Sequence, residues 1–184
     1  MKLALISDLH SQKACLRSVE KISNQQKIGG IICSGDNTVG DDAEFIRQIF
    51  SILKREGKRG FFIWGNSDQE NVRKEILEND FNIHLEKKEF LSLKIFGLSY
   101  MEDYVAFDSS LVKGSIFVTH QPPIQQALLK KCQNAPLMHI SGHLHKKAFV
   151  KEYPATTHIQ VPTLIDGRYA LLDEKTKEVE FEYI

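Results

Sequence analysis

The 184-residue sequence contains only three cysteines, and they lie far apart: Cys15, Cys33 and Cys132. An odd number of thiols without a C-x-x-C pair argues against a disulfide framework. The sequence also lacks the run of about 18 apolar residues that a membrane-spanning helix needs. Its N-terminal apolar run is interrupted at Asp8, which is too early for a signal peptide. These absences predict a protein of the reducing cytoplasm that has no membrane segment.

Net charge is absent as well, because 24 acidic residues balance 24 basic residues. Balanced charge argues against a protein that coats nucleic acid or an anionic membrane, so neither partner is expected. It does not exclude a small anionic substrate. The sequence also has no internal repeat, no low-complexity tract and no linker rich in proline or serine. We therefore expect residues 1–184 to form a single domain.

The first half of the chain alternates between two hydrophobic periods. Strand-like runs at 2–7, 31–33 and 61–64 are each followed by a helical pattern. The first helix is expected over 13–26, with Gly29-Gly30 as its break, and the second begins after Asp41 and Asp42, which can cap it. Asp68 is a candidate cap for the third helix. This β-α-β-α-β-α order predicts a parallel sheet with right-handed crossovers.

The second half is rich in strands. A short helix is expected after Pro122-Pro123, with Ile124, Ala127 and Leu128 on its apolar face, and a hairpin is expected at 175–177. Strands are expected at 90–93, 94–98, 115–118, 138–140, 148–151, 158–161, 169–172 and 179–183. A helix-rich half followed directly by a strand-rich half predicts an α/β fold in which two sheets pack together.

Five short polar motifs follow one another along the chain, and four of them come directly after a strand-like run. Because strand ends in an α/β sheet meet at one edge, we expect these motifs to converge there. Each motif alone is also explained by an ordinary turn or, for the lone histidine, by a buried side chain. The ordered combination favours a two-metal hydrolytic site. The motifs are Asp8-Leu9-His10, Gly35-Asp36-Asn37, Gly65-Asn66-Ser67-Asp68, Thr119-His120 and Gly142-His143-Leu144-His145.

The residue types suit divalent cations. In extended backbone, side chains two positions apart point the same way, so Asp8 and His10 could reach one ion, and His143 and His145 repeat that spacing. The two oxygens of Asp36 could bridge two ions. Imidazole mixed with carboxylate favours Mn, Fe, Zn or Ni over Ca. No cysteine belongs to the set, which argues against a structural zinc site.

The five motifs together resemble the calcineurin-like metallophosphoesterases, whose pattern is D-x-H, G-D, G-N-x-D/E, a lone His and G-H-x-H. Because of its small size, the chain is most similar to the compact bacterial and archaeal phosphodiesterase branch of this family. The resemblance implies a four-layer α-β-β-α sandwich, with two mixed sheets flanked by helices. It also implies one metal ion held by Asp8, His10, Asp36 and His145, and a second held by Asp36, Asn66, His120 and His143.

By this resemblance the protein is a phosphodiesterase in which a metal-bridging hydroxide attacks phosphorus. Two divalent ions are expected, with Mn first and Fe, Ni, Zn or Mg as alternatives. The expected catalytic residues are Asp36, Asn66, Asp68 and His120. Ser67 departs from the family, since many members have a histidine there that is thought to protonate the leaving group. A serine hydroxyl is a poor general acid, so we expect faster turnover of esters with acidic leaving groups.

Several alternatives stay open at this stage. Asp68 could relay a proton, orient a neighbouring ligand or cap a helix. The main functional alternative is a non-catalytic metal-binding scaffold that mediates protein interactions, and a homodimer is compatible with either function. Of the other histidines, His139 is expected in the core, and His84 and His158 at or near the surface. The loops at 37–42 and 100–108 are candidates to select the small phosphoester substrate; Met101, Tyr104 and Phe107 could stack on an aryl group or belong to the core.

Overall fold

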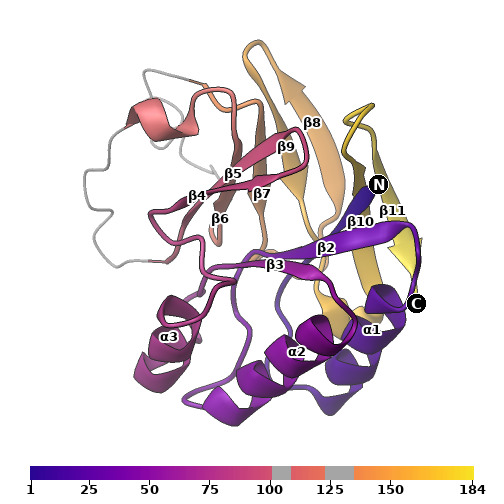
Figure 1. Cartoon of the computed structure of the whole chain (residues 1–184). Helices are drawn as coiled ribbons and strands as arrows, with labels where there is room; N and C mark the ends of the chain where they lie inside the picture. The colour runs from indigo at the N-terminus through magenta and orange to yellow at the C-terminus, as the bar shows by residue number, and fades with distance from the viewer. Residues whose placement is uncertain (101–108, 123–134) are drawn as a thin grey trace.

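The computed structural model describes residues 1–100, 109–122 and 135–184, and its strands form two mixed sheets (Figure 1). The first sheet has the order β11-β10-β1-β2-β3, and only β10 and β11 run antiparallel to their neighbours. Its strands are β1 (Lys2–Ile6), β2 (Ile28–Cys33), β3 (Arg59–Phe62), β10 (Arg168–Asp173) and β11 (Val179–Tyr183).

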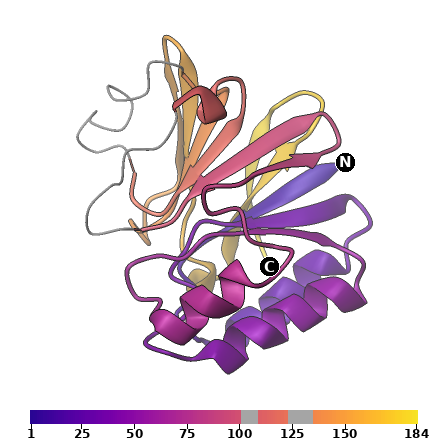
Figure 2. The ribbon, with the colours of Figure 1, turned by 60° about the vertical axis from the view of Figure 1, so that its left-hand side comes forward.

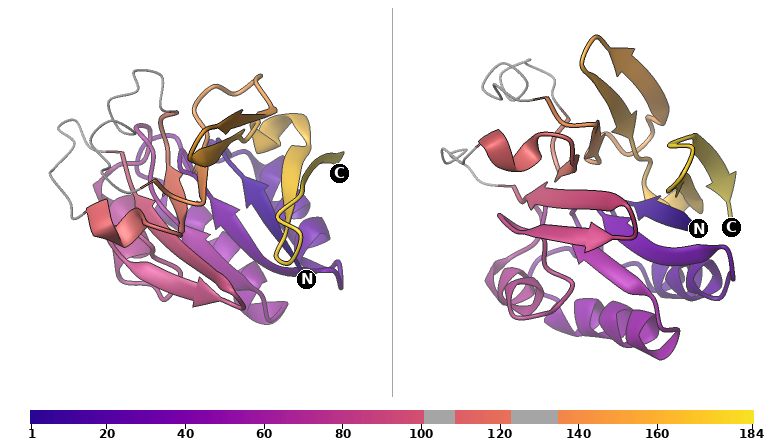
Figure 3. Two further views of the ribbon diagram at one scale, coloured as in Figure 1. Left: turned by 90° about the horizontal axis from the view of Figure 1, so that it is seen from above. Right: turned by 45° about the horizontal axis from the view of Figure 1, so that its top comes forward.

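The second sheet has the order β4-β5-β6-β7-β9-β8. Its four central strands are parallel, and antiparallel strands form the two edges. The strands are β4 (Lys87–Phe90), β5 (Leu93–Leu98), β6 (Ile116–Thr119), β7 (Met138–Ser141), β8 (Phe149–Tyr153) and β9 (Thr156–Gln160). The two sheets pack face to face (Figure 2 and Figure 3).

Three helices cover the outer face of the first sheet, as Figure 2 shows. They are α1 (Lys13–Ser23), α2 (Ala43–Arg55) and α3 (Glu70–Leu77). Strand β1 is buried on both faces: Ala4 and Ile6 pack against the helices, whereas Leu3 and Leu5 pack against the second sheet. Alternate side chains of a strand point to opposite faces, so this one apolar segment joins both cores.

A smaller apolar cluster lies on the second sheet, where Val112 of the 3₁₀ helix η1 (Ser109–Val112) packs with Phe96 and Phe117. The predicted α/β class, with two mixed sheets flanked by helices, is therefore confirmed. The helix expected after Pro122 and most of the loop expected at 100–108 lie outside the described residues. No helix that the structure describes has the length and apolar character needed to cross a membrane.

Two glycines differ from their expected role. Gly29 and Gly30 lie inside β2 and do not end a helix; α1 ends at Ser23. A Cβ atom on Gly29 would collide with the side chain of Met1, and one on Gly30 would lie 2.8 Å from the carbonyl oxygen of Arg59. These glycines therefore allow close packing within the sheet. Local propensity alone predicts a helix break at the same two residues.

Other boundaries also differ from expectation. The strand expected at 90–93 is wrong, because Leu91 and Ser92 form the turn between the antiparallel strands β4 and β5. The N-cap of α3 is Gln69, without a side-chain cap, so Asp68 does not cap that helix. By contrast, Asp42 caps α2 as expected, since its Oδ1 accepts a hydrogen bond from the N–H of Phe45 at 3.1 Å. The hairpin at 175–177 is confirmed between β10 and β11.

Candidate metal centre

The polar motifs lie at the carboxyl ends of five strands, three from the first sheet and two from the second. Asp8, Asp36 and Asn66 come after the parallel strands β1, β2 and β3. His120 follows β6, and His143 lies in the loop after β7, which is parallel to β6. The convergence predicted from the sequence is confirmed by the distances between these side chains.

One cluster joins Asp8, His10, Asp36 and His145, whose ligand atoms all lie within 4.8 Å of one another. Nε2 of His145 is 3.3 Å from Oδ1 of Asp8, and Nε2 of His10 is 3.7 Å from Oδ2 of Asp36. The two carboxylates come from neighbouring strands of the first sheet, while His145 comes from the second sheet. The site therefore spans both sheets.

A second cluster surrounds Nε2 of His120. This atom lies 3.4 Å from Oδ1 of Asp36, 3.1 Å from Oδ1 of Asn66 and 3.2 Å from Nδ1 of His143. Nδ1 of His120 lies 2.9 Å from the carbonyl oxygen of Ser34, which can only accept a hydrogen bond. In the neutral ring Nδ1 therefore carries the proton, and Nε2 presents a lone pair to the other side chains.

Asp36 lies between the two clusters. Its Oδ2 faces His10, and its Oδ1 faces His120 and accepts a hydrogen bond of 2.9 Å from the N–H of Ser67. Burial alone would raise the pKa of this carboxyl, but in the metal-free protein the hydrogen bond and charge of the protonated His120 ring, with the Ser67 contact, lower it to about 2. Asp36 is therefore ionised at neutral pH although only 2 % of its surface is exposed.

The donor atoms fit divalent cations. Asp8 is completely buried; its Oδ2 accepts a hydrogen bond from the N–H of His143 at 3.0 Å, but its Oδ1 receives none from any described residue. A buried carboxylate oxygen that accepts no hydrogen bond is costly unless a positive charge is close to it. Around it stand carboxylate, amide and imidazole groups, the mixture that Mn, Fe, Zn and Ni accept. The first cluster therefore contains a buried oxygen that a cation would stabilise, and the donor atoms of both clusters are of types that bind divalent cations.

The interpretation of the D-x-H and H-x-H spacings assumes extended backbone, in which residues two positions apart point the same way. The backbone at these positions is not extended. Left-handed φ values, between 23° and 69°, occur at Asp8, His10, Asp36, His143 and His145. The side chains converge because tight left-handed bends turn them inward, and not because alternate residues of a strand share a face. Such a conformation costs a non-glycine residue on the order of 1 kcal/mol, and it concentrates at functional sites.

Two glycines make room for the clusters. A Cβ atom on Gly65 would collide with Oδ1 of Asp36, and one on Gly142 would collide with Oγ of Ser7. Both glycines directly precede a proposed ligand. Both positions therefore need glycine, because a side chain there would occupy the space of Asp36 or Ser7.

Asp68 does not point into the clusters but ties their supporting loops together. Its carboxylate accepts hydrogen bonds from the N–H groups of Gly65 (2.8 Å), Asn37 (3.1 Å) and Thr38 (2.8 Å) and from the side chains of Asn37 and Thr38 (both 3.0 Å). Burial raises the pKa of Asp68, and these donors oppose that shift. Its oxygens are occupied by five donors that belong to the loops after β2 and β3.

The side chain of Ser67 is hydrogen-bonded to the backbone. Its hydroxyl donates a hydrogen bond of 2.7 Å to the carbonyl oxygen of Thr38, and its Oγ lies 3.5 Å from Nδ1 of His10. The carbonyl of Ser34, which orients His120, was not found from the sequence, because a backbone oxygen leaves no signal in residue identity. The remaining histidines are distributed partly as expected. His139 is fully buried and His84 is partly buried, but His158 is 3 % exposed and therefore belongs to the core.

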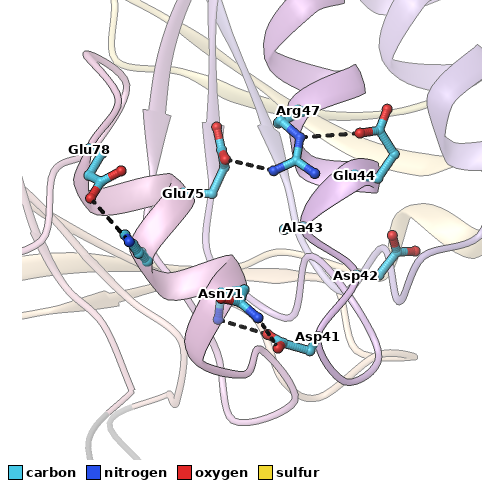
Figure 4. A pocket seen from close by; sticks show the side chains of 9 residues that line it. Asp41, Asp42, Ala43, Glu44, Arg47, Asn71, Glu75 and Glu78 are labelled. Atoms are coloured by element: carbon cyan, nitrogen blue, oxygen red, sulfur yellow. Dashed lines mark hydrogen bonds and ion pairs between the residues drawn. The ribbon is translucent and has the colours of Figure 1, made fainter.

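A separate pocket lies between α2 and α3 and contains none of the predicted catalytic or metal-binding residues, although Asp41 and Asp42 of the loop at 37–42 line it (Figure 4). Acidic side chains dominate its lining, and several are already paired. Arg47 binds Glu44 at 3.2 Å and Glu75 at 3.0 Å, and Asn71 donates to Asp41. These pairings leave few free groups for a ligand, so this pocket is not the candidate site.

Comparisons with known proteins place the chain in a family. A family model described as the calcineurin-like phosphoesterase superfamily domain matches residues 1–163. No protein of curated function matches by sequence. A crystal structure from Thermus thermophilus is 14% identical, with a TM-score of 0.76, and the match covers 99% of this chain and 98% of that one.

Two other solved structures carry functional descriptions. A protein described as a novel archaeal phosphodiesterase is 19% identical, with a TM-score of 0.62 and full coverage of both chains (100% each). A dimetal phosphatase from Danio rerio is 11% identical, with a TM-score of 0.68, and the match covers 100% of this chain and 98% of that one. At these identities the likeness concerns the fold.

Proposed function

This chain belongs to the calcineurin-like phosphoesterase superfamily, and from this premise we propose that it is a phosphodiesterase that uses two divalent cations. The observation that carries the proposal is the position of Asp36, with one carboxylate oxygen toward each cluster. One ion would be held by Asp8, His10, Asp36 and His145, and the other by Asp36, Asn66, His120 and His143. When bound, the two cations supply an activated water and positive charge for the phosphoryl oxygens, with Mn as the first candidate.

The protein side chains prepare this site before substrate arrives. Asp36 is ionised because its pKa is about 2, so it presents negative charge to both clusters. The carbonyl of Ser34 orients His120 so that its Nε2 can act as a ligand. Asn66 is exposed, and the His145 side chain is 47% exposed, whereas Asp8 and Asp36 are buried. We propose that the phosphoester approaches from the side of Asn66 and His145.

The structure offers no evident side chain at Ser67 or Asp68 to protonate the leaving oxygen of the substrate. The Ser67 hydroxyl proton is donated to the Thr38 carbonyl, which supports the expectation that Ser67 is not a general acid. Asp68 holds five hydrogen bonds from the loops below the site. This supports a positioning role for Asp68 in place of a proton relay. The enzyme would then favour diesters whose leaving groups need no proton, such as aryl esters.

We further propose that residues 1–184 form a single domain, since β10 and β11, which lie beyond the matched residues 1–163, continue the first sheet beside β1. A reducing cytoplasm is the proposed location, and the free thiols of Cys15 and Cys33 in the core are consistent with it. Cys132 lies outside the described residues.

Hydrolysis of bis(p-nitrophenyl) phosphate after treatment with chelator and reloading with Mn²⁺ tests the proposal. We expect activity that depends on Mn²⁺, is higher on this diester than on p-nitrophenyl phosphate, and falls at least about 100-fold in Asp36→Asn. Asp80→Asn is the matched control, because Asp80 is an exposed aspartate that follows α3 and belongs to none of the predicted site residues or substrate loops. Hydrolysis that survives both the chelator and Asp36→Asn would refute the proposal. Metal binding without turnover would favour the scaffold alternative.

A further inference from the structure

Thr163 makes hydrogen bonds to two of the proposed ligand residues at once. It follows β9 and is 4 % exposed. Its hydroxyl donates a hydrogen bond of 2.6 Å to the carbonyl oxygen of Asp8, and its N–H donates one of 2.9 Å to the carbonyl oxygen of His145. Asp8 follows a strand of the first sheet, and His145 follows a strand of the second. One residue therefore connects the two loops across the boundary between the sheets.

Both residues that Thr163 holds have left-handed backbone, with φ of 54° at Asp8 and 23° at His145. A non-glycine residue stays in this conformation only when surrounding contacts determine it. The Asp8 carbonyl is held by the Thr163 hydroxyl, so the side chain of Thr163 supplies part of that determination. Loss of the hydroxyl would leave a carbonyl oxygen in the core without this donor, which is costly.

The residues around Thr163 continue the same connection. Leu164 donates its N–H to the carbonyl of Ser7 at 2.9 Å, next to Asp8. On the other side, Nε2 of Gln160 donates to the carbonyl of Gly142 at 2.6 Å, next to His143. The segment 160–164 therefore contacts both metal-binding loops through these four hydrogen bonds, and among the three residues that make them only Thr163 reaches both loops.

We propose that Thr163 is a positioning residue that sets the separation of Asp8 and His145, and through it the affinity of the first cluster for its cation. This inference rests on the proposed metal centre. The controlled distance is the 3.3 Å between Oδ1 of Asp8 and Nε2 of His145. Groups that orient ligands from behind change metal affinity about 10- to 100-fold when they are removed.

Three variants isolate the hydroxyl. Thr163→Val removes it at nearly constant volume, and Thr163→Ser restores it. Thr156→Val is the matched control: Thr156 is 8 % exposed in the adjacent strand β9, and its hydroxyl has no hydrogen-bond partner among the described residues. The same chemical change at Thr156 therefore removes no hydrogen bond.

Mn²⁺ titration of the full chain, followed by electron paramagnetic resonance, measures both ions. We expect Thr163→Val to bind one of two ions about 10- to 100-fold more weakly and to show an uncoupled single-ion spectrum at intermediate Mn²⁺. Thr163→Ser and Thr156→Val should bind both ions like the wild type. A general loss of stability would instead weaken the binding of both ions. Wild-type binding in Thr163→Val would overturn the inference while leaving the proposed function intact.

Amide hydrogen exchange in metal-free protein tests the positioning role of Thr163 independently of the proposed metal-dependent function. In Thr163→Val the segments 7–11 and 142–145 should exchange about tenfold faster than in the wild type, because the Asp8 carbonyl loses its hydroxyl donor, whereas Thr156→Val should not change them. The hydroxyl of Thr163 also accepts a hydrogen bond from the N–H of Ile165 at 3.2 Å, so exchange at Ile165 should rise as well. Unchanged exchange in both segments would overturn the inference about Thr163. If the wild type binds no Mn²⁺ at all, the proposed function fails, and this exchange comparison alone decides whether Thr163 holds the loops.

Discussion

The Nε2 atoms of His10 and His145 lie 3.2 Å apart, although 135 positions separate the two residues along the chain. Nδ1 of His10 lies 3.5 Å from Oγ of Ser67, whose proton is donated to a backbone carbonyl, so this nitrogen can donate to Ser67. Its Nε2 then has a lone pair directed at a second imidazole. A cation between the two rings would accept a lone pair from each Nε2, whereas without a cation His145 must donate a proton to His10 across this distance.

Metal should therefore stabilise the folded chain. A cation that binds only the folded state and is present at about 100 times its dissociation constant adds about 2.7 kcal/mol. For a chain of this length, that corresponds to a rise in Tm of at least about 5 °C. Thermal unfolding with excess Mn²⁺ and with chelator measures the difference. In His145→Ala the rise should be much smaller; an identical Tm with and without Mn²⁺ in the wild type would contradict a metal site.

The rate should depend steeply on the leaving group. Because the Ser67 proton is held by Thr38, the leaving oxygen receives little help, and aryl esters with acidic phenols should react fastest. A series of substituted phenyl diesters with Mn²⁺ present measures the slope of log kcat/KM against leaving-group pKa. Ser67→His should flatten this slope by accelerating the poorest leaving groups by at least about tenfold. A flat dependence in the wild type would show that another group supplies the proton.

Asp68→Asn should be strongly destabilising. An asparagine amide places N–H groups where Asp68 now accepts from the backbone N–H groups of Gly65, Asn37 and Thr38. Lost hydrogen bonds to a buried charged group cost about 1.5–3 kcal/mol each, so we expect a loss of at least about 2 kcal/mol in urea unfolding. Asp42→Asn is the control, since asparagine also caps a helix and should change stability by less than about 0.5 kcal/mol. Equal stability of the two variants would rule out this role for Asp68.

Stability should fall as the pH is lowered from 6.5 toward 4. Burial lowers the pKa of His139 to about 3 and that of His158 to about 4, both from an ordinary value of 6.5. In this range the unfolded chain binds protons that the folded chain does not. Each histidine therefore contributes a loss of about 1.4 kcal/mol per pH unit.

Urea unfolding at several pH values checks this slope in metal-free protein. His139→Phe keeps a ring that can stack on Phe117, which lies 5.1 Å from the His139 ring, and should reduce the slope by about one proton. The absolute stability of this variant also changes, since His139 loses its 2.7 Å contact with Thr119. For that reason the slope is the decisive quantity. An unchanged slope would mean that His139 is not kept neutral by the fold.

Much of the fold could be predicted because its signals are local. The apolar runs that form β1 and β3, and the spacing of Phe45, Ile46 and Ile49 in α2, report burial directly through their period. Gly29 and Gly30 differ from expectation because their role depends on Met1 and Arg59, which lie far away in sequence. Propensity cannot detect a contact of that kind.

The site was predictable in composition but not in geometry. Asp8, Asp36 and His120 could be named as candidate ligands because metal ligands come from few residue types and because strand ends converge. The left-handed bends that aim the two aspartates leave no mark in the sequence, since aspartate is common in other conformations. Thr163 was missed for a related reason: it acts through one hydroxyl and one amide on residues distant in the chain.

The left-handed residues of the proposed metal-binding loops also bear on how this protein could evolve. Glycine adopts such backbone without strain, so replacing His145 or Asp36 with glycine would relieve local strain in the free polypeptide. In the absence of bound metal, selection for heat resistance alone would therefore tend to remove these proposed ligands. A descendant released from its catalytic task could lose these side chains first and keep the two-sheet body, since the cores beneath do not depend on them.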